Sequence, residues 1–226
     1  MYDPVERENE IMNMLKKFAD NGLEFVIVGG YAVSAFRHRF SIDADIVIMK
    51  GDKEKFEKIL KDENYRKTIS MQLKNIYSSE FVRYENKELK VSIDLLIGGL
   101  EARQTRASFS FEFLFKNSSK RLIEGVEKAV EARVPRREIL IVLKLHSSRL
   151  TDLRDVAALG FNLDMDVIRE SLFRGNRNVL RKNMKKLGSL IEKTEFRDSF
   201  KGVFMEKGYR INPGEIRKLV MLKDKK

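Results

Sequence analysis

The chain contains 226 residues, 42% of them apolar, and has a formal net charge of +11. These values predict a globular protein with one large or two small domains and a substantial hydrophobic core. The absence of cysteine excludes a disulfide framework, a thiolate metal site and a cysteine nucleophile, and two histidines are too few for a multi-histidine zinc site.

The apolar runs are shorter than the roughly 20 residues that span a bilayer. The first residues are charged and do not resemble a secretory leader. We therefore expect a cytoplasmic protein without a membrane contact.

The positive charge is concentrated near the end of the chain. Residues 174–226 contain sixteen Lys or Arg and six Asp or Glu, a balance of +10, so residues 1–173 carry only +1. Such a basic segment favours binding to a polyanion such as RNA. A solvated helical surface that keeps the protein soluble is the alternative interpretation.

The first part of the chain alternates between strand and helix patterns. Apolar residues at helical spacing predict a helix over residues 4–20, a short helix follows at 31–37, and Gly51-Asp52 begins another that ends near residue 61. Strands are predicted at residues 23–28, 42–49, 65–72, 76–84, 89–97 and 109–115. The segment 120–134 is ambiguous, with a hairpin as one interpretation.

Beyond Pro135 every predicted segment is helical, and His146 is expected on the inner face of the first of these helices. The predicted helices cover residues 136–150, 152–159, 164–173, 176–192 and 195–207, with a last one after Pro213. The predicted fold class is therefore α+β. A small mixed sheet with flanking helices is expected in residues 1–134, and a helical, basic domain in residues 135–226.

Two carboxylates in the strand at 42–49 are the first sign of chemistry. Asp43 and Asp45 point to the same face because alternate side chains of a strand share a face. Such close carboxylates repel each other unless a cation lies between them, and Mg²⁺ prefers carboxylate oxygens. Asp94 is the other acid within a long apolar strand. If that strand is a neighbour, three carboxylates could bind two Mg²⁺ ions, with Mn²⁺ as an alternative.

Gly29 and Gly30 lie between the strand at 23–28 and the helix that follows it. Free N–H groups at a helix N-terminus favour phosphate, so we expect these glycines to bind the nucleotide. Each feature alone has a common structural explanation: a tight turn for the glycines, and a hydrogen-bonded structural role for Asp94. Their combined spacing predicts phosphoryl or nucleotidyl transfer.

This combination resembles the nucleotidyltransferases of the DNA polymerase β superfamily, in which Gly-Gly or Gly-Ser, a short helix and Asp-x-Asp precede a later strand Asp. It is most similar to the AbiEii-type family of abortive-infection and toxin–antitoxin nucleotidyltransferases, which have Gly-Gly-x-Ala and then His-Arg-x-Ser-x-Asp-x-Asp. The residues at these places are Gly29, Gly30, Ala32, His38, Arg39, Ser41, Asp43 and Asp45. The resemblance covers roughly residues 23–160 and implies a nucleotidyltransferase-type sheet.

The resemblance also extends to a helix that carries Lys144, followed by Arg149 and by Asp152 and Asp155. It implies that Lys144 contacts the triphosphate and that the Asp152–Asp155 segment shapes the nucleotide pocket. One departure is Thr151, where the family has a Lys, which leaves one triphosphate contact open.

A second departure is Tyr31, where the family has a small Ser or Thr. A hydroxyl contact to the phosphate would then have to come from Ser34. Arg39 either binds the nucleotide or ties the helix to the strand, and for His38 we favour the structural role. Lys144 could also be a snorkelling helix lysine, and Asp155 a first-turn helix acid.

The expected function is Mg²⁺-dependent transfer of an NMP from an NTP, with ATP as one candidate, to a hydroxyl acceptor. The expected acceptor is RNA such as tRNA. Asp43, Asp45 and Asp94 would bind metal, and Asp94 would also orient or deprotonate the acceptor. The family implies a toxin-like role with an antitoxin partner. The alternatives are a protein or small-molecule acceptor, and a nucleotide- or RNA-binding module that has lost catalysis.

Overall fold

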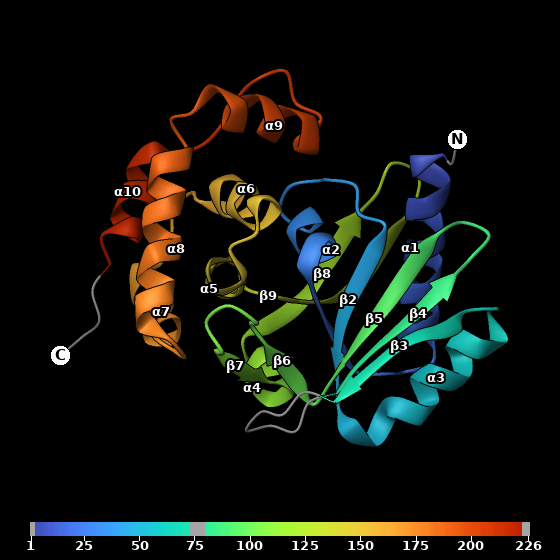
Figure 1. Cartoon of the computed structure of the whole chain (residues 1–226). Helices are drawn as coiled ribbons and strands as arrows, with labels where there is room; N and C mark the ends of the chain where they lie inside the picture. The colour runs from blue at the N-terminus through green and yellow to red at the C-terminus, as the bar shows by residue number, and fades with distance from the viewer. Residues whose placement is uncertain (1–2, 73–79, 223–226) are drawn as a thin grey trace. The chain divides into compact units, whose positions relative to one another are not determined.

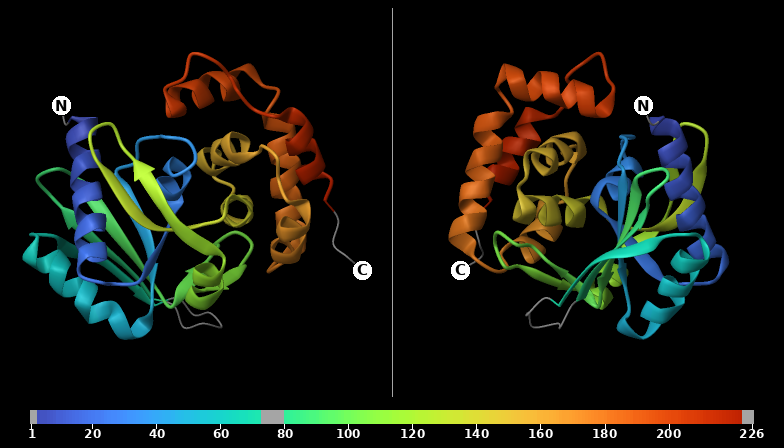
Figure 2. Two further views of the ribbon diagram at one scale, coloured as in Figure 1. Left: turned by 180° about the vertical axis from the view of Figure 1, so that it is seen from behind. Right: turned by 45° about the vertical axis from the view of Figure 1, so that its right-hand side comes forward.

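The computed structural model describes residues 3–72 and 80–222. The chain divides into two compact units. The first unit contains Met1–Glu101 and Ser108–Pro135, and the second contains Ala102–Ala107 and Arg136–Lys226. The second unit therefore includes a short loop from the earlier part of the chain as well as the C-terminal helices (Figures 1 and 2).

The first unit is built on a seven-stranded mixed sheet with the strand order β3-β4-β5-β2-β1-β9-β8. The strands are β1 (Phe25–Val28), β2 (Asp43–Ile48), β3 (Arg66–Gln72), β4 (Glu80–Asn86), β5 (Val91–Ile97), β8 (Ser118–Glu124) and β9 (Ala129–Pro135). The pairs β2–β5 and β1–β9 are parallel, and the other neighbours are antiparallel. This mixed sheet with flanking helices confirms the α+β class. The β8–β9 pair shows that residues 120–134 lie in a hairpin.

Helices α1 (Pro4–Asp20) and α3 (Lys53–Asp62) cover one face of this sheet (Figure 1). Phe18 of α1, Phe25 of β1 and Phe56 of α3 pack with ring centroids 4.9–6.1 Å apart. Because side chains alternate along β1, Val26 and Val28 point to the opposite face. Helices α1 and α3 therefore pack on one face of the sheet and do not cover the face to which Val26 and Val28 point.

The helix predicted over 4–20 is confirmed, and its start has a local cause. The side chain of Asp3 accepts a hydrogen bond from the backbone N–H of Val5, and Pro4 occupies the first helical position. Asp52 is the N-cap residue of α3, as predicted, but its side chain forms no hydrogen bond to the helix backbone. It also ends a 3₁₀ turn, η1 (Lys50–Asp52), and its carboxylate accepts from Lys55 Nζ.

Helix α2 (Gly29–Ser34) begins two residues earlier than predicted, directly at the end of β1. Gly29 has a φ of +67°, a left-handed conformation that glycine adopts without strain. The chain therefore turns from strand into helix within one residue, and the glycine pair forms the first positions of the helix.

The strand predicted over 109–115 is wrong from Phe111 onward. Only Ser108–Ser110 forms a strand, β7, which pairs with β6 (Gly99–Glu101), and Phe111–Lys116 forms helix α4. The side chain of Ser110 caps this helix by accepting from the backbone N–H of Phe113. The alternating aromatic residues also fit a helix, because Phe111 and Phe115 lie one turn apart with their rings in contact. The predicted strand 76–84 lies partly outside the described residues, and its described end belongs to β4.

The second unit is helical apart from its loop. Its helices are α5 (Arg137–Ser147), α6 (Leu150–Leu159), α7 (Met165–Leu172), α8 (Arg177–Leu190), α9 (Thr194–Phe204) and α10 (Pro213–Val220). Helix α5 packs against α6, α7 and α8, and α8 packs against α10. Among the helices that the structure describes, none is long and apolar enough to cross a membrane.

His146 joins α5 to the loop 102–107 and to α7. Its Nδ1 lies 2.8 Å from Thr105 Oγ1, and its Nε2 lies 2.9 Å from the carbonyl oxygen of Leu172. The ring is fully buried, and burial lowers its pKa to about 4. A neutral imidazole satisfies both contacts, with Nε2–H donating to Leu172 and Nδ1 accepting from Thr105.

Candidate active site

Three aspartates share the sheet face that α1 and α3 leave uncovered. In the parallel pair β2–β5, Asp45 lies opposite Asp94, and Asp43 lies opposite Ser92. Paired residues of neighbouring strands point to the same face, as do alternate residues of one strand. We call these three aspartates the carboxylate face. The strand that carries Asp94 is thus a neighbour of the strand that carries Asp43 and Asp45, which is the arrangement that a site of three carboxylates requires.

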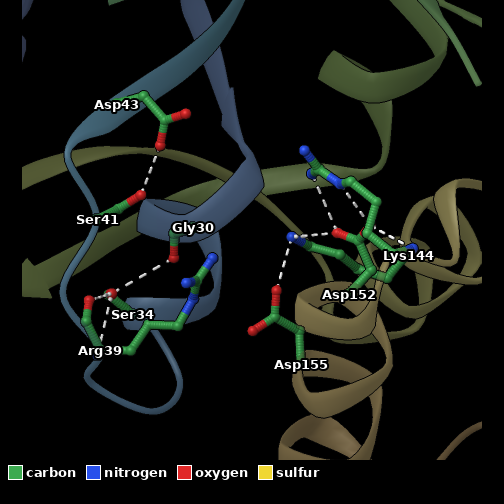
Figure 3. A network of polar contacts seen from close by, with 9 residues as sticks. Gly30, Ser34, Arg39, Ser41, Asp43, Lys144, Asp152 and Asp155 are labelled. Carbon is green, nitrogen blue, oxygen red and sulfur yellow. Dashed lines mark hydrogen bonds and ion pairs between the residues drawn. The ribbon is translucent and has the colours of Figure 1, made fainter. Parts of the chain in front are cut away.

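Asp43 is oriented by the loop that precedes β2. Ser41 Oγ donates a hydrogen bond to Asp43 Oδ1 at 2.7 Å (Figure 3). The hydroxyl of Tyr31 in turn donates to the carbonyl oxygen of Ser41 at 3.0 Å. Tyr31 is fully buried, and burial raises the pKa of its phenol above the usual value. The residue that departs from the family pattern therefore anchors the loop that positions Asp43.

The two glycines are required by the side chains that pack on them. A Cβ atom on Gly29 would overlap with the carboxylate of Asp45. A Cβ atom on Gly30 would lie 2.7 Å from Nη2 of Arg39 and 2.8 Å from Oγ of Ser41. The glycine pair thus brings the start of α2 close to the carboxylate face. Nucleotide binding by Gly29 and Gly30 stays a prediction, and α2 has only six residues.

Ser34 and Arg39 both lie beside this glycine pair, and Figure 3 shows them with Gly30. Ser34 Oγ donates to the carbonyl oxygen of Arg39 at 2.9 Å and lies 3.4 Å from that of Gly30. These bonds tie the end of α2 to the following loop, so they favour a structural role for the Ser34 hydroxyl. A nucleotide contact by either residue stays a prediction. His38 has a structural contact, because its Nε2 lies 2.8 Å from Glu8 Oε1 of α1.

Asp94 is held by a residue that the sequence analysis did not identify. Arg83 of β4 lies opposite Asp94 and forms a bidentate ion pair, with Nε–Oδ1 at 2.8 Å and Nη2–Oδ2 at 2.7 Å. The Asp94 side chain is 3% exposed and that of Arg83 is 30% exposed. Arg83 is the only basic residue of the predicted strand 76–84, which is a weak signal. The pairing itself depends on the β4–β5 register.

Burial and neighbouring charges act in opposite directions on Asp94. Burial raises its pKa, the Arg83 guanidinium opposes this shift, and the charge of Asp43 adds to it. The hydrogen bond to Asp94 raises the pKa of Arg83 above its ordinary value, so this cation stays charged. Within the carboxylate face, Asp94 therefore has a permanent counter-ion in Arg83.

The donor set fits a divalent cation in part. Within residues 3–72 and 80–222, no group of three or more His, Asp or Glu side chains is arranged to hold a metal ion. Asp43 and Asp45 nevertheless provide two half-buried carboxylates on one face. Mg²⁺ is commonly bound by one or two carboxylates together with water and substrate phosphates. These two residues would suit an Mg²⁺ ion that accompanies a triphosphate.

A second group of charged residues lies within the second unit, between α5 and α6. Lys144 Nζ forms ion pairs with Asp155 Oδ2 at 2.8 Å and with Asp152 Oδ1 at 3.3 Å (Figure 3). Arg149 donates to Asp152 through its backbone N–H at 3.0 Å and its Nε at 2.8 Å. We call Lys144, Asp152, Asp155 and Arg149 the lysine cluster. The cluster brings together Lys144, Asp152 and Asp155, the three residues of this unit that were predicted to bind the nucleotide.

Three residues of the lysine cluster are enclosed by protein, while the Arg149 side chain is 69% exposed. The side chain of Lys144 is 6% exposed, and those of Asp152 and Asp155 are 1% and 0% exposed. Burial raises the pKa of Asp152, but the hydrogen bond from Arg149 and the charge of Lys144 outweigh it, so the pKa is lowered. Lys144 is therefore not a snorkelling lysine. A triphosphate contact by Lys144 and a pocket role for the two aspartates stay predictions.

Comparisons with known proteins gave likenesses only to solved structures. No family model matches the chain, and no curated protein matches it either. Among solved structures, the lincosamide antibiotic adenylyltransferase LnuA with lincomycin bound is 17% identical, with a TM-score of 0.47 over 67% of this chain and 95% of that chain. ANT(2'')-Ia in complex with adenylyl-2''-tobramycin is 13% identical, with a TM-score of 0.49 over 79% and 97%. JHP933 from Helicobacter pylori is 18% identical, with a TM-score of 0.44 over 89% and 78%.

Proposed function

We propose that this chain is a Mg²⁺-dependent nucleotidyltransferase, which transfers an NMP from an NTP to a hydroxyl acceptor. The observation that carries the proposal is the direct pairing of Asp45 with Asp94 in the β2–β5 register, with Asp43 on the same face. The glycine pair at the start of α2 lies against this face, as the packing of Gly29 on Asp45 indicates. An acidic face beside a strand-to-helix turn without side chains suits a metal and a triphosphate.

Each residue of the carboxylate face has a separate role in this proposal. A bound Mg²⁺ would provide Lewis-acid stabilisation of charge on the phosphoryl oxygens, and Asp43 and Asp45 would hold it. Asp94 accepts the proton of the acceptor hydroxyl while the new bond to the α-phosphorus forms and the bond to pyrophosphate breaks. Its carboxylate can accept this hydrogen bond while it is paired with Arg83, since each oxygen has a second lone pair.

Labelled nucleotides test the activity directly. The full chain is incubated with each of the four α-³²P-labelled NTPs, Mg²⁺, and total RNA, cell extract or a small-molecule fraction as acceptor. We expect label transfer that falls at least about a hundredfold in Asp43→Asn and Asp45→Asn, because lost metal stabilisation is worth several kcal/mol. Asp62→Asn changes an exposed carboxylate of α3 and should retain full activity. Nucleotide binding without transfer to any acceptor would instead support the binding-module alternative.

RNA is the acceptor that the charge distribution favours. Helix α8 contains no acidic residue, and Arg181, Lys182 and Lys185 are exposed on it. Its apolar residues Leu180, Met184 and Leu187 are buried, so the helix presents a basic face to solvent. Lys and Arg side chains of this kind neutralise RNA phosphates and release counterions. A toxin-like role and an antitoxin partner stay predictions from the resemblance.

Salt dependence tests the RNA proposal. Binding of total tRNA should weaken steeply as the salt concentration rises, and the slope should decrease when Arg181, Lys182 and Lys185 are changed to Gln. The matched control changes three lysines of α3 to Gln, namely Lys55, Lys58 and Lys61. Binding that ignores salt, or that the two triple variants reduce equally, would exclude the basic face of α8 as the RNA site.

A further inference from the structure

Arg83 binds the carboxylate of Asp94, which the sequence predicted to be a metal ligand. Both carboxylate oxygens of Asp94 accept hydrogen bonds from Arg83, at 2.8 Å and 2.7 Å. The carboxylate is almost completely buried, while the guanidinium is partly exposed. Charge-assisted bidentate pairs are among the strongest side-chain hydrogen bonds, so this arrangement holds Asp94 in one orientation.

The register places Arg83 at the end of a row of charges. Arg83 lies opposite Asp94 across β4–β5, and Asp94 lies opposite Asp45 across β5–β2. Arg83 also interacts electrostatically with Asp43. One side of Asp94 therefore faces a permanent cation, and the other side faces the pair Asp43 and Asp45. A divalent cation bound through Asp94 would be repelled by the guanidinium.

We infer that Arg83 takes the place of one of two expected metal ions, so that the chain binds a single divalent cation through Asp43 and Asp45. This inference rests on the proposed function. Two carboxylates are sufficient for one Mg²⁺ ion when water and phosphates complete its coordination. Recruiting Asp94 as a metal ligand would break a buried ion pair and leave Arg83 without its partner. Arg83 is thus a positioning residue, which reserves Asp94 for the acceptor hydroxyl.

Metal titration separates the single-ion arrangement from the two-ion arrangement. The full-length chain, saturated with a non-hydrolysable NTP analogue, is titrated with Mn²⁺, and free Mn²⁺ is measured by electron paramagnetic resonance. A titration of the analogue alone is subtracted. We expect one ion per chain, with affinity reduced about tenfold or more in Asp43→Asn and Asp45→Asn. Asp94→Asn should bind Mn²⁺ like the unmodified chain. Two ions per chain, or an Asp94→Asn variant as weak as Asp43→Asn, would overturn the inference.

Variants of Arg83 provide the opposite test. Arg83→Met releases Asp94 and should create a second Mn²⁺ site, which the double variant with Asp94→Asn removes. Arg83→Lys keeps the charge and should retain one ion. Arg66→Met changes an exposed arginine of β3 and is the matched control. Thermal unfolding shows whether each variant folds, and if Arg83→Met does not, the Asp94→Asn titration decides alone.

The outcomes also separate this inference from the proposed function. Two ions bound by an unmodified chain that transfers label would reject the role of Arg83 and keep the nucleotidyltransferase. An unmodified chain that neither binds Mn²⁺ nor transfers label would reject both. One ion, with transfer that depends on Asp43 and Asp45, supports both.

Discussion

The carboxylate face of the first unit and the lysine cluster of the second unit both contain an aspartate bound by a basic side chain, but they differ in exposure. In the lysine cluster, Lys144 and both of its carboxylate partners are enclosed. On the carboxylate face, Arg83 is partly exposed, and Asp43 and Asp45 are half-buried. Enclosed ion pairs are costly to break because the remaining charge has no water to solvate it. Half-exposed carboxylates remain accessible to a ligand. The carboxylate face therefore suits chemistry, and the lysine cluster suits the folding of its own unit.

The largest expected effect is on the stability of the second unit. Lys144→Met leaves Asp152 and Asp155 without their shared cation, and breaking a buried ion pair typically costs about 3–5 kcal/mol. Urea unfolding monitored by circular dichroism measures the loss. Lys201→Met removes an ion pair to Asp198 that lies at the surface, and it should cost less than about 1 kcal/mol. Equal losses in the two variants would show that the lysine cluster is not an enclosed pair.

His146 gives a pH-dependent effect in the same unit. Burial lowers its pKa to about 4 from 6.5, so the unfolded chain takes up a proton before the folded one does. The free energy of unfolding should therefore fall as the pH decreases from about 6.5 toward 4, by up to about 1.4 kcal/mol for each pKa unit of the shift. His146→Gln should be less stable at pH 7 but lose less stability over this range. If the free energy of unfolding of His146→Gln and of the unmodified chain changed equally with pH, His146 would not be the group responsible.

Removal of a charge from the carboxylate face should not lower the stability of the fold, in contrast to Lys144→Met. Asp43→Asn removes one of three neighbouring negative charges, so its free energy of unfolding should stay within about 0.5 kcal/mol of the original value or rise. Because the same variant is expected to lose transfer activity, it separates function from folding. A loss as large as that of Lys144→Met would mean that Asp43 is a structural residue.

A variant of the loop before β2 tests how Asp43 is oriented. Ser41→Ala removes the hydrogen bond to Asp43 and should cost about 0.5–1.5 kcal/mol of stability. If this contact orients a metal ligand, Mn²⁺ affinity should fall about tenfold or more. Ser70→Ala, on the exposed strand β3, is the matched control. An unchanged Mn²⁺ affinity in Ser41→Ala would show that the loop does not position the ligand.

Local patterns were sufficient for much of the fold and for part of the site. Helical periodicity predicted α1 to the residue, and alternation placed Asp43 and Asp45 on one face. The same rules failed at Phe111–Lys116, where aromatic residues that alternate along a strand also meet at one turn of a helix. The side chain of Ser110 caps the helix by accepting from the backbone N–H of Phe113. The strand prediction did not take this cap into account.

Local sequence patterns identified the components of the candidate site: two aspartates in one strand, one in another, and a glycine pair at a strand-to-helix turn. The register of the folded sheet is what brings these residues together and gives Asp94 a basic neighbour. The β2–β5 register placed Asp45 opposite Asp94, and the β4–β5 register brought Arg83 onto Asp94. The physical reason is that side-chain alternation is a property of each strand, whereas register between distant strands depends on the packing of the whole sheet.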